Sequence, residues 1–316
     1  MTLTPRLALL LTLPPIMWAG NAVVGSLAIR EIGPLWLNTV RWVLALVLLL
    51  PLGWHALATP QARQAVARRW RYLLLLGLLG VGCYNALQYM ALGTSTPINV
   101  TLIAASGPVW MMAMGALFFG ERPRRAQLLG ALLSVAGVLL VLGRGELAAL
   151  ARVQLVAGDL LMLLAVLSWC GYSWLLARPP ASMQGVARPN WGWAEFLLLQ
   201  VVFGLLWASG GALLAELAWP TSPPVWTAQL LAVVLFVAVG PSLVAYRCWG
   251  LGVAEAGPQV AAFFANLTPL FAALLSAALL GQAPRPYHVL AFLLIVGGIV
   301  VSSRGALAQV KPELPS

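Results

Sequence analysis

Aromatic, amide and phenol side chains recur three or four residues apart inside long apolar segments of this sequence. That spacing places the members of each group on one face of a helix. The groups are Trp18 with Asn21, Tyr84 with Gln88, Trp169 with Tyr172, Ser242 with Tyr246 and Trp249, and Gln259 with Phe263 and Asn266. Such faces could enclose a small amphipathic molecule, because rings shield its apolar part while a few amide and phenol groups meet its polar part.

Ten of these side chains are our candidate substrate-binding residues. They are Trp18, Asn21, Tyr84, Gln88, Trp169, Tyr172, Tyr246, Trp249, Phe263 and Asn266. The same pattern is also typical of a structural role, in which polar groups form hydrogen bonds between helices and rings fill helix interfaces. For any single residue the structural role is the simpler explanation, whereas the set as a whole favours a cavity.

Two basic residues inside apolar segments are candidate charge partners for a substrate. Arg41 lies five or six residues into its segment, where it could bind an anionic group or bond a helix terminus. Arg247 stands beside Tyr246 near the predicted inner end of its segment, so it could meet a carboxylate or extend to the cytoplasmic surface. The acidic residues in or next to the apolar segments all lie toward segment ends, at Asp159, Glu195, Glu216 and Glu255. The lack of a mid-membrane carboxylate favours facilitated diffusion or exchange over proton coupling.

The elements that must position these residues are membrane helices. Hydrophobic residues make up 61% of the 316 positions and charged residues only 8%, which excludes an ordinary water-soluble domain. A bilayer core about 30 Å thick needs about 20 apolar residues for each helical crossing. Ten segments meet this need, at residues 7–29, 35–56, 72–92, 97–119, 125–143, 157–177, 192–214, 227–249, 258–280 and 286–303.

The basic residues indicate a topology rather than a nucleic-acid partner. The net charge is +10, and thirteen of the eighteen Lys and Arg residues lie on the cytoplasmic side if the N-terminus does. This bias predicts cytoplasmic N- and C-termini in a multi-pass protein of the cell (inner) membrane. The three cysteines form no CxxC pair, and neither HExxH nor GxSxG occurs. We therefore expect neither an enzyme nor a bound metal or other cofactor.

The two halves of the sequence match each other. A shift of 161 positions superimposes Pro97 on Pro258, Pro108 on Pro269 and Gly137 on Gly298. The repeats are predicted at 1–143 and 157–303, joined by a loop at 144–156 and followed by a cytoplasmic tail at 304–316. Each holds five segments, and because five is odd, the second copy enters the membrane in the opposite orientation. The fold class expected is therefore all-α and integral to the membrane, with two inverted repeats around a central cavity.

Three motifs are characteristic of a known family: the WAGN run from Trp18 to Asn21, Arg41 in LNTVRWVLA, and the Pro108–Leu140 run with its weaker copy at Pro269–Val301. With them, nearly the whole chain resembles the EamA-domain family of the drug/metabolite transporter superfamily. The resemblance implies ten helices, a cavity walled by helices 1, 3, 4, 6, 8 and 9, and export of small metabolites, amino acids or drugs. It also implies a peripheral second helix, which favours a structural role for Arg41. The sequence departs from the family at Gln282, where a glutamate is more common.

We predict a secondary transporter that works without ATP. It would export small amphipathic metabolites, such as amino acids or drug-like molecules, by alternating access between the inverted repeats. Its partners would be the small-molecule substrate and the lipid bilayer, and it would act as a monomer or homodimer. The alternative is a non-transporting integral-membrane receptor or assembly partner, for which the inverted duplication has no evident use.

Overall fold

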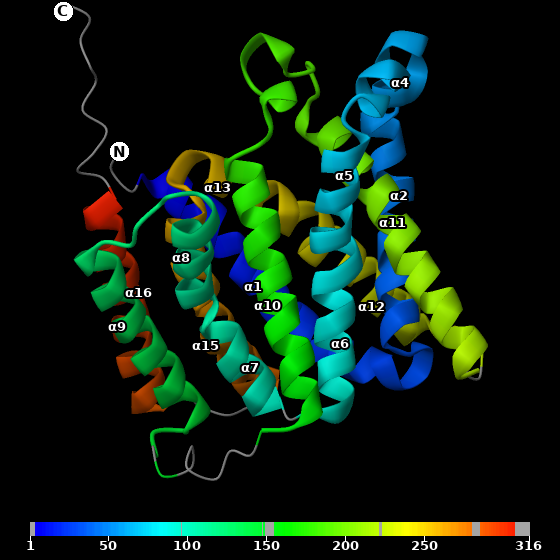
Figure 1. Cartoon of the computed structure of the whole chain (residues 1–316). Helices are drawn as coiled ribbons and strands as arrows, with labels where there is room; N and C mark the ends of the chain where they lie inside the picture. Colours follow the sequence, from blue (N-terminus) through cyan, green and yellow to red (C-terminus); the bar gives the residue numbers. More distant parts are fainter. Residues whose placement is uncertain are drawn as a thin grey trace, which may run out of the picture.

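Apolar segments form helices here because a helix satisfies its backbone N–H and C=O groups within its own segment, where a bilayer offers no water. The computed structural model of the chain describes residues 4–95, 97–146, 148, 155–220, 223–279 and 285–306. These residues form helices and connecting turns without any strand (Figure 1). Nine of the described helical stretches are long and apolar enough to cross a membrane, or ten if the bent pair Asn99–Ala105 and Gly107–Phe118 counts as one span. The prediction of an all-helical membrane protein is confirmed.

The spans follow the predicted order, and several of them consist of two or three helical pieces. In chain order they are α1 (Pro5–Ile32); α2 (Pro34–Gly53); α5 (Trp70–Leu76), η1 (Gly77–Cys83) and α6 (Tyr84–Thr94); α7 (Pro97–Ala105) and α8 (Gly107–Phe118); α9 (Arg125–Leu142); α10 (Ala157–Ala177); α11 (Trp193–Ala218); α12 (Ala228–Val237), η5 (Ala238–Val244) and α13 (Ala245–Ala256); α14 (Pro258–Ala265) and α15 (Leu267–Leu279); and α16 (Pro286–Ala306). Short helices α3 (His55–Ala58), α4 (Pro60–Ala67), η3 (Ala181–Met183) and η4 (Gly185–Ala187) lie in the connections.

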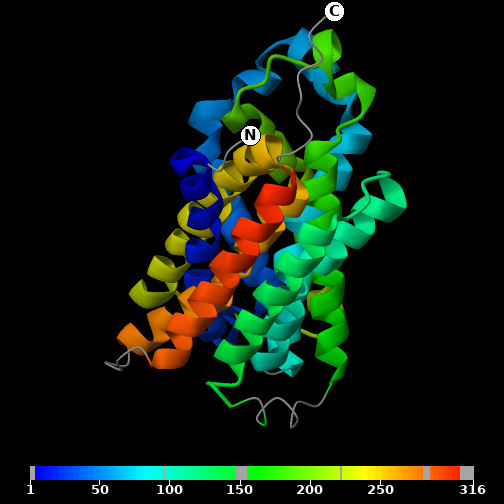
Figure 2. The ribbon, with the colours of Figure 1, turned by 90° about the vertical axis from the view of Figure 1, so that its left-hand side faces the viewer.

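The 161-residue offset found in the sequence also relates features of the structure. It carries the π-helical segment η1 (Gly77–Cys83) onto the π-helical segment η5 (Ala238–Val244), and the start of α9 onto the start of α16. The equivalent helices α9 and α16 pack side by side (Figure 2). Gly130 lies against Ser302, whereas Gly137 lies against Ile295, so the two helices run antiparallel. Small residues at this interface let the two backbones approach closely.

The π-helical segments are held by side chains of neighbouring helices. A π-turn shifts the backbone hydrogen bonds from their usual register, which frees carbonyl oxygens for other donors. Four different helices supply donors, as Ser168 Oγ bonds Leu79 O at 2.6 Å, Asn38 Nδ2 bonds Val81 O at 3.1 Å, the Tyr246 hydroxyl bonds Gly80 O, and Trp18 Nε1 bonds Pro241 O at 3.4 Å. Such bonds fix how each helix is rotated against its neighbours.

The basic connections gather on the face of the bundle at which α1 begins and α16 ends (Figure 1). Arg69, after α4, donates from Nε to Ser182 O at 2.9 Å and from Nη2 to Ala187 O at 2.5 Å. Arg178 forms an ion pair with Glu121. These contacts join three connections that lie far apart in the sequence, at residues 54–69, 119–124 and 178–192. We call this side of the molecule the termini face.

The largest difference from the predicted helix boundaries lies at the end of the eighth segment. The eighth segment was expected to end at 249, whereas α13 continues to Ala256. A single residue, Gly257, then connects α13 to α14, with a φ of 81° that favours glycine. Pro258 follows and suits the first position of a new helix. Gln282, residues 147 and 149–154 of the predicted loop, and the predicted tail from residue 307 lie outside the described residues.

Candidate functional site: a cavity between the spans

A cavity of about 430 Å³ lies between the helices. Its walls come from α1, from α6, from α7 with α8, from α10, from α13 and from α14 with α15. These are the six spans that the family resemblance implied. On α1 the lining residues run from Trp18 to Val23, and on α6 from Tyr84 to Leu92. Since α1 starts at the termini face and α6 ends at the opposite face, the cavity occupies the half of the bundle away from the termini.

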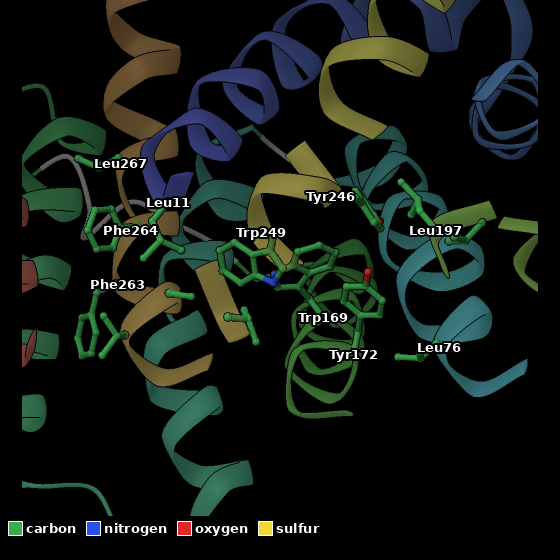
Figure 3. Packing of buried hydrophobic residues seen from close by; sticks show 14 of the residues in the cluster. Leu11, Leu76, Trp169, Tyr172, Leu197, Tyr246, Trp249, Phe263, Phe264 and Leu267 are labelled. Carbon is green, nitrogen blue, oxygen red and sulfur yellow. The ribbon is translucent and has the colours of Figure 1, made fainter. Parts of the chain in front are cut away.

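Three tryptophans form the floor of the cavity. The ring centroids of Trp18 and Trp169 are 5.1 Å apart in an edge-to-face arrangement, and Trp249 lies 5.3 Å from each of them. Tyr84 lies 4.9 Å from Trp169 and continues this surface up the wall. Edge-to-face and tilted rings at these distances attract each other beyond simple burial. The aromatic floor is therefore stable, and Figure 3 shows two of its rings, those of Trp169 and Trp249, next to each other.

Hydrogen bonds hold the floor in place. Trp249 Nε1 donates to Ser173 Oγ at 3.0 Å, and that hydroxyl donates to the carbonyl of Trp169 at 2.8 Å. The backbone of α10 is thus linked to the indole ring of Trp249 on α13. Because the indole N–H groups of Trp18 and Trp249 are already occupied, these rings offer a ligand mainly their apolar faces and edges.

The polar groups of the wall are few and uncharged. Among the described lining residues they belong to Tyr84, Gln88, Thr101, Asn266 and Thr268, and none of the lining residues carries a charge. Asn266 lies at the junction between α14 and α15 and is only 1% exposed. Neither its amide nitrogen nor its amide oxygen has a hydrogen-bond partner among the described residues. A buried amide without partners costs free energy, which a polar ligand or water would recover.

Two segments of the chain, residues 6–143 and 156–304, match the EamA-like transporter family. The chain belongs to this family. It is a membrane transporter of the EamA type, which agrees with the family resemblance and with the predicted class of function.

Named relatives of this EamA-like chain are transporters and exporters. An uncharacterized transporter of Archaeoglobus fulgidus is 25% identical over 93% of this chain and 96% of its own length. The aromatic amino acid exporter YddG of Ancylobacter novellus is 27% identical, covering 72% of this chain and 74% of its own. A probable terminal-alkyne amino-acid exporter of Streptantibioticus cattleyicolor is 23% identical, covering 78% and 77%. A crystal structure of another protein shares the fold, with a TM-score of 0.72 and 21% identity over 95% of this chain and 97% of that one.

The cavity of this EamA-like chain is lined by six of the ten candidate substrate-binding residues. They are Trp18, Tyr84, Gln88, Trp169, Trp249 and Asn266. The other four candidates are buried elsewhere and are not among the lining residues. Tyr172 and Tyr246 form a second aromatic layer behind Trp169, at centroid distances of 5.1 and 5.3 Å (Figure 3). Phe263 belongs to the apolar core, on the far side of Trp249 from the two tyrosines.

Asn21, the fourth of these, belongs to a hydrogen-bond network around Arg41. The Arg41 side chain is fully buried. Its Nε and Nη2 donate to Ser242 Oγ at 3.0 and 2.7 Å, and its Nη1 donates to Asn85 Oδ1 and Tyr89 OH, both at 2.9 Å. The Tyr89 hydroxyl in turn donates to Asn21 Oδ1 at 2.7 Å. Arg41 thus points into the bundle and joins α1, α2, α6 and η5 rather than a helix terminus, which favours the structural role considered for it.

Arg247 does not meet the cavity. Because α13 continues to Ala256, Arg247 lies nine residues before the helix end rather than close to it. Its side chain is exposed and its guanidinium lies 4.2 Å from the ring centre of Trp193, on the outside of the bundle. Residues 246 and 247 point to different sides of the helix, so Arg247 does not lie beside Tyr246 in the bundle interior.

The sequence patterns missed several wall residues. Thr101, Cys170 and Thr268 line the cavity but belong to none of the polar and aromatic groups predicted from the sequence. Thr268 directly precedes Pro269, a proline that the 161-residue shift superimposes on Pro108, and this position was the one available signal. The described residues contain no group of three His, Cys, Asp or Glu side chains that could hold a metal ion.

Proposed function

We propose that this EamA-like transporter exports small, net-neutral amphipathic molecules, with amino acids bearing aromatic or large apolar side chains as the first candidates. The observation that carries the proposal is the uncharged aromatic cavity between the spans. A charged substrate without a counter-charge would be poorly stabilised in such a wall. An amino acid zwitterion, by contrast, presents both donors and acceptors to Gln88, Asn266 and the two threonines, and its side chain fits the tryptophan floor. The exporter names of two relatives support this class.

Alternating access is supported by the asymmetry along the bundle. The cavity lies away from the termini face, while the termini half of the same bundle is filled by packed apolar side chains such as Leu11 against Gly252. Near that end, Gln127 Nε2 also donates to Gln259 Oε1 at 2.5 Å and ties α9 to α14. Antiparallel, equivalent helices support an inverted repeat, in which the two halves exchange their open and closed arrangements.

The bent spans are the natural hinges for that exchange. The pair Asn99–Ala105 and Gly107–Phe118 bends by 41° at Ser106. Asn266 marks the equivalent break between α14 and α15, one residue from the position predicted by the repeat offset. Pro108 and Pro269 follow these breaks and weaken the local backbone hydrogen bonds. With cytoplasmic termini in the inner membrane, as the basic termini face favours, the cavity lies in the outer half of the bundle, and export would end with release of the substrate from this arrangement.

Uptake of labelled phenylalanine into proteoliposomes that contain only this protein tests the proposal. We expect saturable uptake, accelerated when the vesicles are preloaded with unlabelled phenylalanine, because a carrier exchanges substrate at a single site. Lysine and glutamate should not compete. A protein that binds phenylalanine without any flux would instead be a receptor, and the transport proposal would fall.

Cys170 provides a second readout at the cavity itself. It lines the cavity, whereas Cys83 and Cys248 do not. In a Cys83→Ser/Cys248→Ser background, we expect a small thiol reagent to label Cys170 and transported substrate to slow this labelling. If a transported substrate leaves the rate of Cys170 labelling unchanged, the transport pathway does not pass through this cavity.

A further inference from the structure

A second cavity, of about 710 Å³, opens on the termini face between α5, α10 and the connection after α10. Four arginines line it: Arg68, Arg69, Arg71 and Arg178. The neighbouring carboxylate is Glu121, which pairs with Arg178. The cavity therefore carries a clear excess of positive charge at the level of the membrane border, where the indole of Trp70 also lies.

The four arginines fall into two pairs with different tasks. Arg69 bonds the carbonyls of Ala65, Ser182 and Ala187, and Arg178 bonds Glu121, so both support the local fold. The side chains of Arg68 and Arg71 are exposed and form no hydrogen bond or ion pair with any described residue. The contact that Arg71 makes is with the ring of Trp70, 5.5 Å from its guanidinium. Two guanidinium groups on adjacent turns of the chain are thus available to an anion.

The floor of this cavity is apolar. Leu75 and Leu175 line it beneath the arginines, together with Tyr72, whose hydroxyl is occupied by the carbonyl of Leu175 at 2.9 Å. Leu75 is 42% exposed and belongs to an apolar span, so we infer that its exposed surface meets lipid chains. A basic rim above an apolar, lipid-facing floor matches the layout of a phospholipid, with its phosphate above and its acyl chain below.

We propose that this cavity is a binding site for the phosphate-bearing headgroup of an anionic phospholipid, held by Arg68 and Arg71 with an acyl chain along Leu75. Planar guanidinium groups donate paired hydrogen bonds to phosphate oxygens. The phosphate diester of an anionic phospholipid can accept these bonds, and the acidic or hydroxyl-bearing group attached to it can accept further ones. The site is separate from the transport cavity, because the two cavities share no lining residue.

Thermal unfolding of the full chain in neutral detergent, titrated with phosphatidylglycerol, measures this binding. The test variant is Arg68→Gln/Arg71→Gln. Its matched control is Arg122→Gln/Arg125→Gln, which removes two exposed arginines from the same face outside the cavity. We expect phosphatidylglycerol to stabilise the wild-type chain and the control alike, and to bind the test variant about thirtyfold more weakly. Arg68→Lys/Arg71→Lys keeps the charge but loses the paired guanidinium hydrogen bonds, so its affinity should lie between those of the wild-type chain and the glutamine variant.

Three results would overturn the proposal. Equal weakening in both double variants would assign the effect to general surface charge, and unchanged binding in the test variant would remove the site. Inorganic phosphate or glycerol 3-phosphate forms the third arm. If either stabilises the chain at the same concentration as phosphatidylglycerol, the cavity binds free phosphate rather than lipid. Phosphatidylcholine, with a neutral headgroup, should give no stabilisation beyond that of the detergent.

Discussion

Two buried polar clusters, the Arg41 network and the junction at Asn266, lie in the same bundle but differ in how their hydrogen bonds are satisfied. Arg41 is fully buried, and Nε, Nη1 and Nη2 all reach oxygen atoms of Ser242, Asn85 or Tyr89. Asn266 is equally inaccessible, yet its side chain has no partner among the described residues. Only Asn266 lines the cavity. In a bilayer, a satisfied polar cluster belongs to the structure, whereas an unsatisfied one at a cavity marks a place for a ligand.

The Arg41 network is also unusual in its chemistry. Its acceptors within the described chain are hydroxyl and amide oxygens rather than carboxylates. Ser242 accepts from Arg41 and donates to the carbonyl of Val237 at 2.7 Å, which ties the charge to the π-helical segment η5. The positive charge is therefore spread over several neutral dipoles. Removing the guanidinium would leave Asn85 Oδ1 without its donor and would deprive Ser242 and Tyr89 of one of their hydrogen bonds.

The largest expected effect comes from Arg41→Met. We expect it to lower the free energy of unfolding by about 3 kcal/mol or more, because several buried acceptors lose a charged donor at once. Arg247→Met is the control, since Arg247 is exposed over Trp193, and its effect should stay within about 0.5 kcal/mol. Reversible unfolding in mixed micelles measures both. Similar losses in the two variants would contradict the structural role of the network.

Substitutions of two asparagines test the difference between the Arg41 network and the junction at Asn266 directly. Asn85 and Asn266 are both buried, but only Asn85 receives a hydrogen bond from Arg41. Asn85→Leu should cost about 1.5–3 kcal/mol of stability, the range for a bond to a charged group. Asn266→Leu should leave stability unchanged or raise it, while transport falls at least about tenfold, which corresponds to one lost ligand bond of about 1.4 kcal/mol. The opposite assignment of stability and transport losses would reverse our view of the two clusters.

The aromatic floor should respond more mildly to a conservative change. Trp169→Phe keeps a ring but reduces its contacts with Trp18 and Trp249, so we expect the apparent substrate affinity to fall by about two- to tenfold. Trp174→Phe is the matched control, because Trp174 stacks on Phe119 and is not among the residues that line the cavity. Concentration-dependent flux at equal protein density distinguishes the two. An equal fall for Trp174→Phe would mean that the effect is not specific to the cavity.

The smallest change in transport is expected for Tyr246→Phe. The Tyr246 hydroxyl donates to Gly80 O in η1 and lies behind the floor rather than in the cavity. Loss of this bond should cost about 1 kcal/mol of stability and leave the apparent substrate affinity unchanged. A strong loss of substrate affinity at normal stability would place Tyr246 in the ligand path.

Residues that were predicted to share one helix face show where prediction from sequence reached its limit. Tyr246 and Trp249 share a face of α13, yet Trp249 forms the cavity floor and Tyr246 packs behind Trp169. Spacing identifies a common face but says nothing about the depth at which the cavity ends. Trp18 and Asn21 separate in the same way, since Asn21 bonds Tyr89 in the Arg41 network.

The sequence by itself determined the membrane class, the order of the spans, the repeat offset and the family, because hydropathy, proline and glycine positions act locally along the chain. It also indicated the basic face, since Arg residues cluster in the connections. Only the tertiary structure decided which polar side chains meet the cavity and which bond one another. The rotation of each helix depends on π-helical segments and on partners up to 223 residues away, as for Trp18 and Pro241, and no local pattern records such contacts.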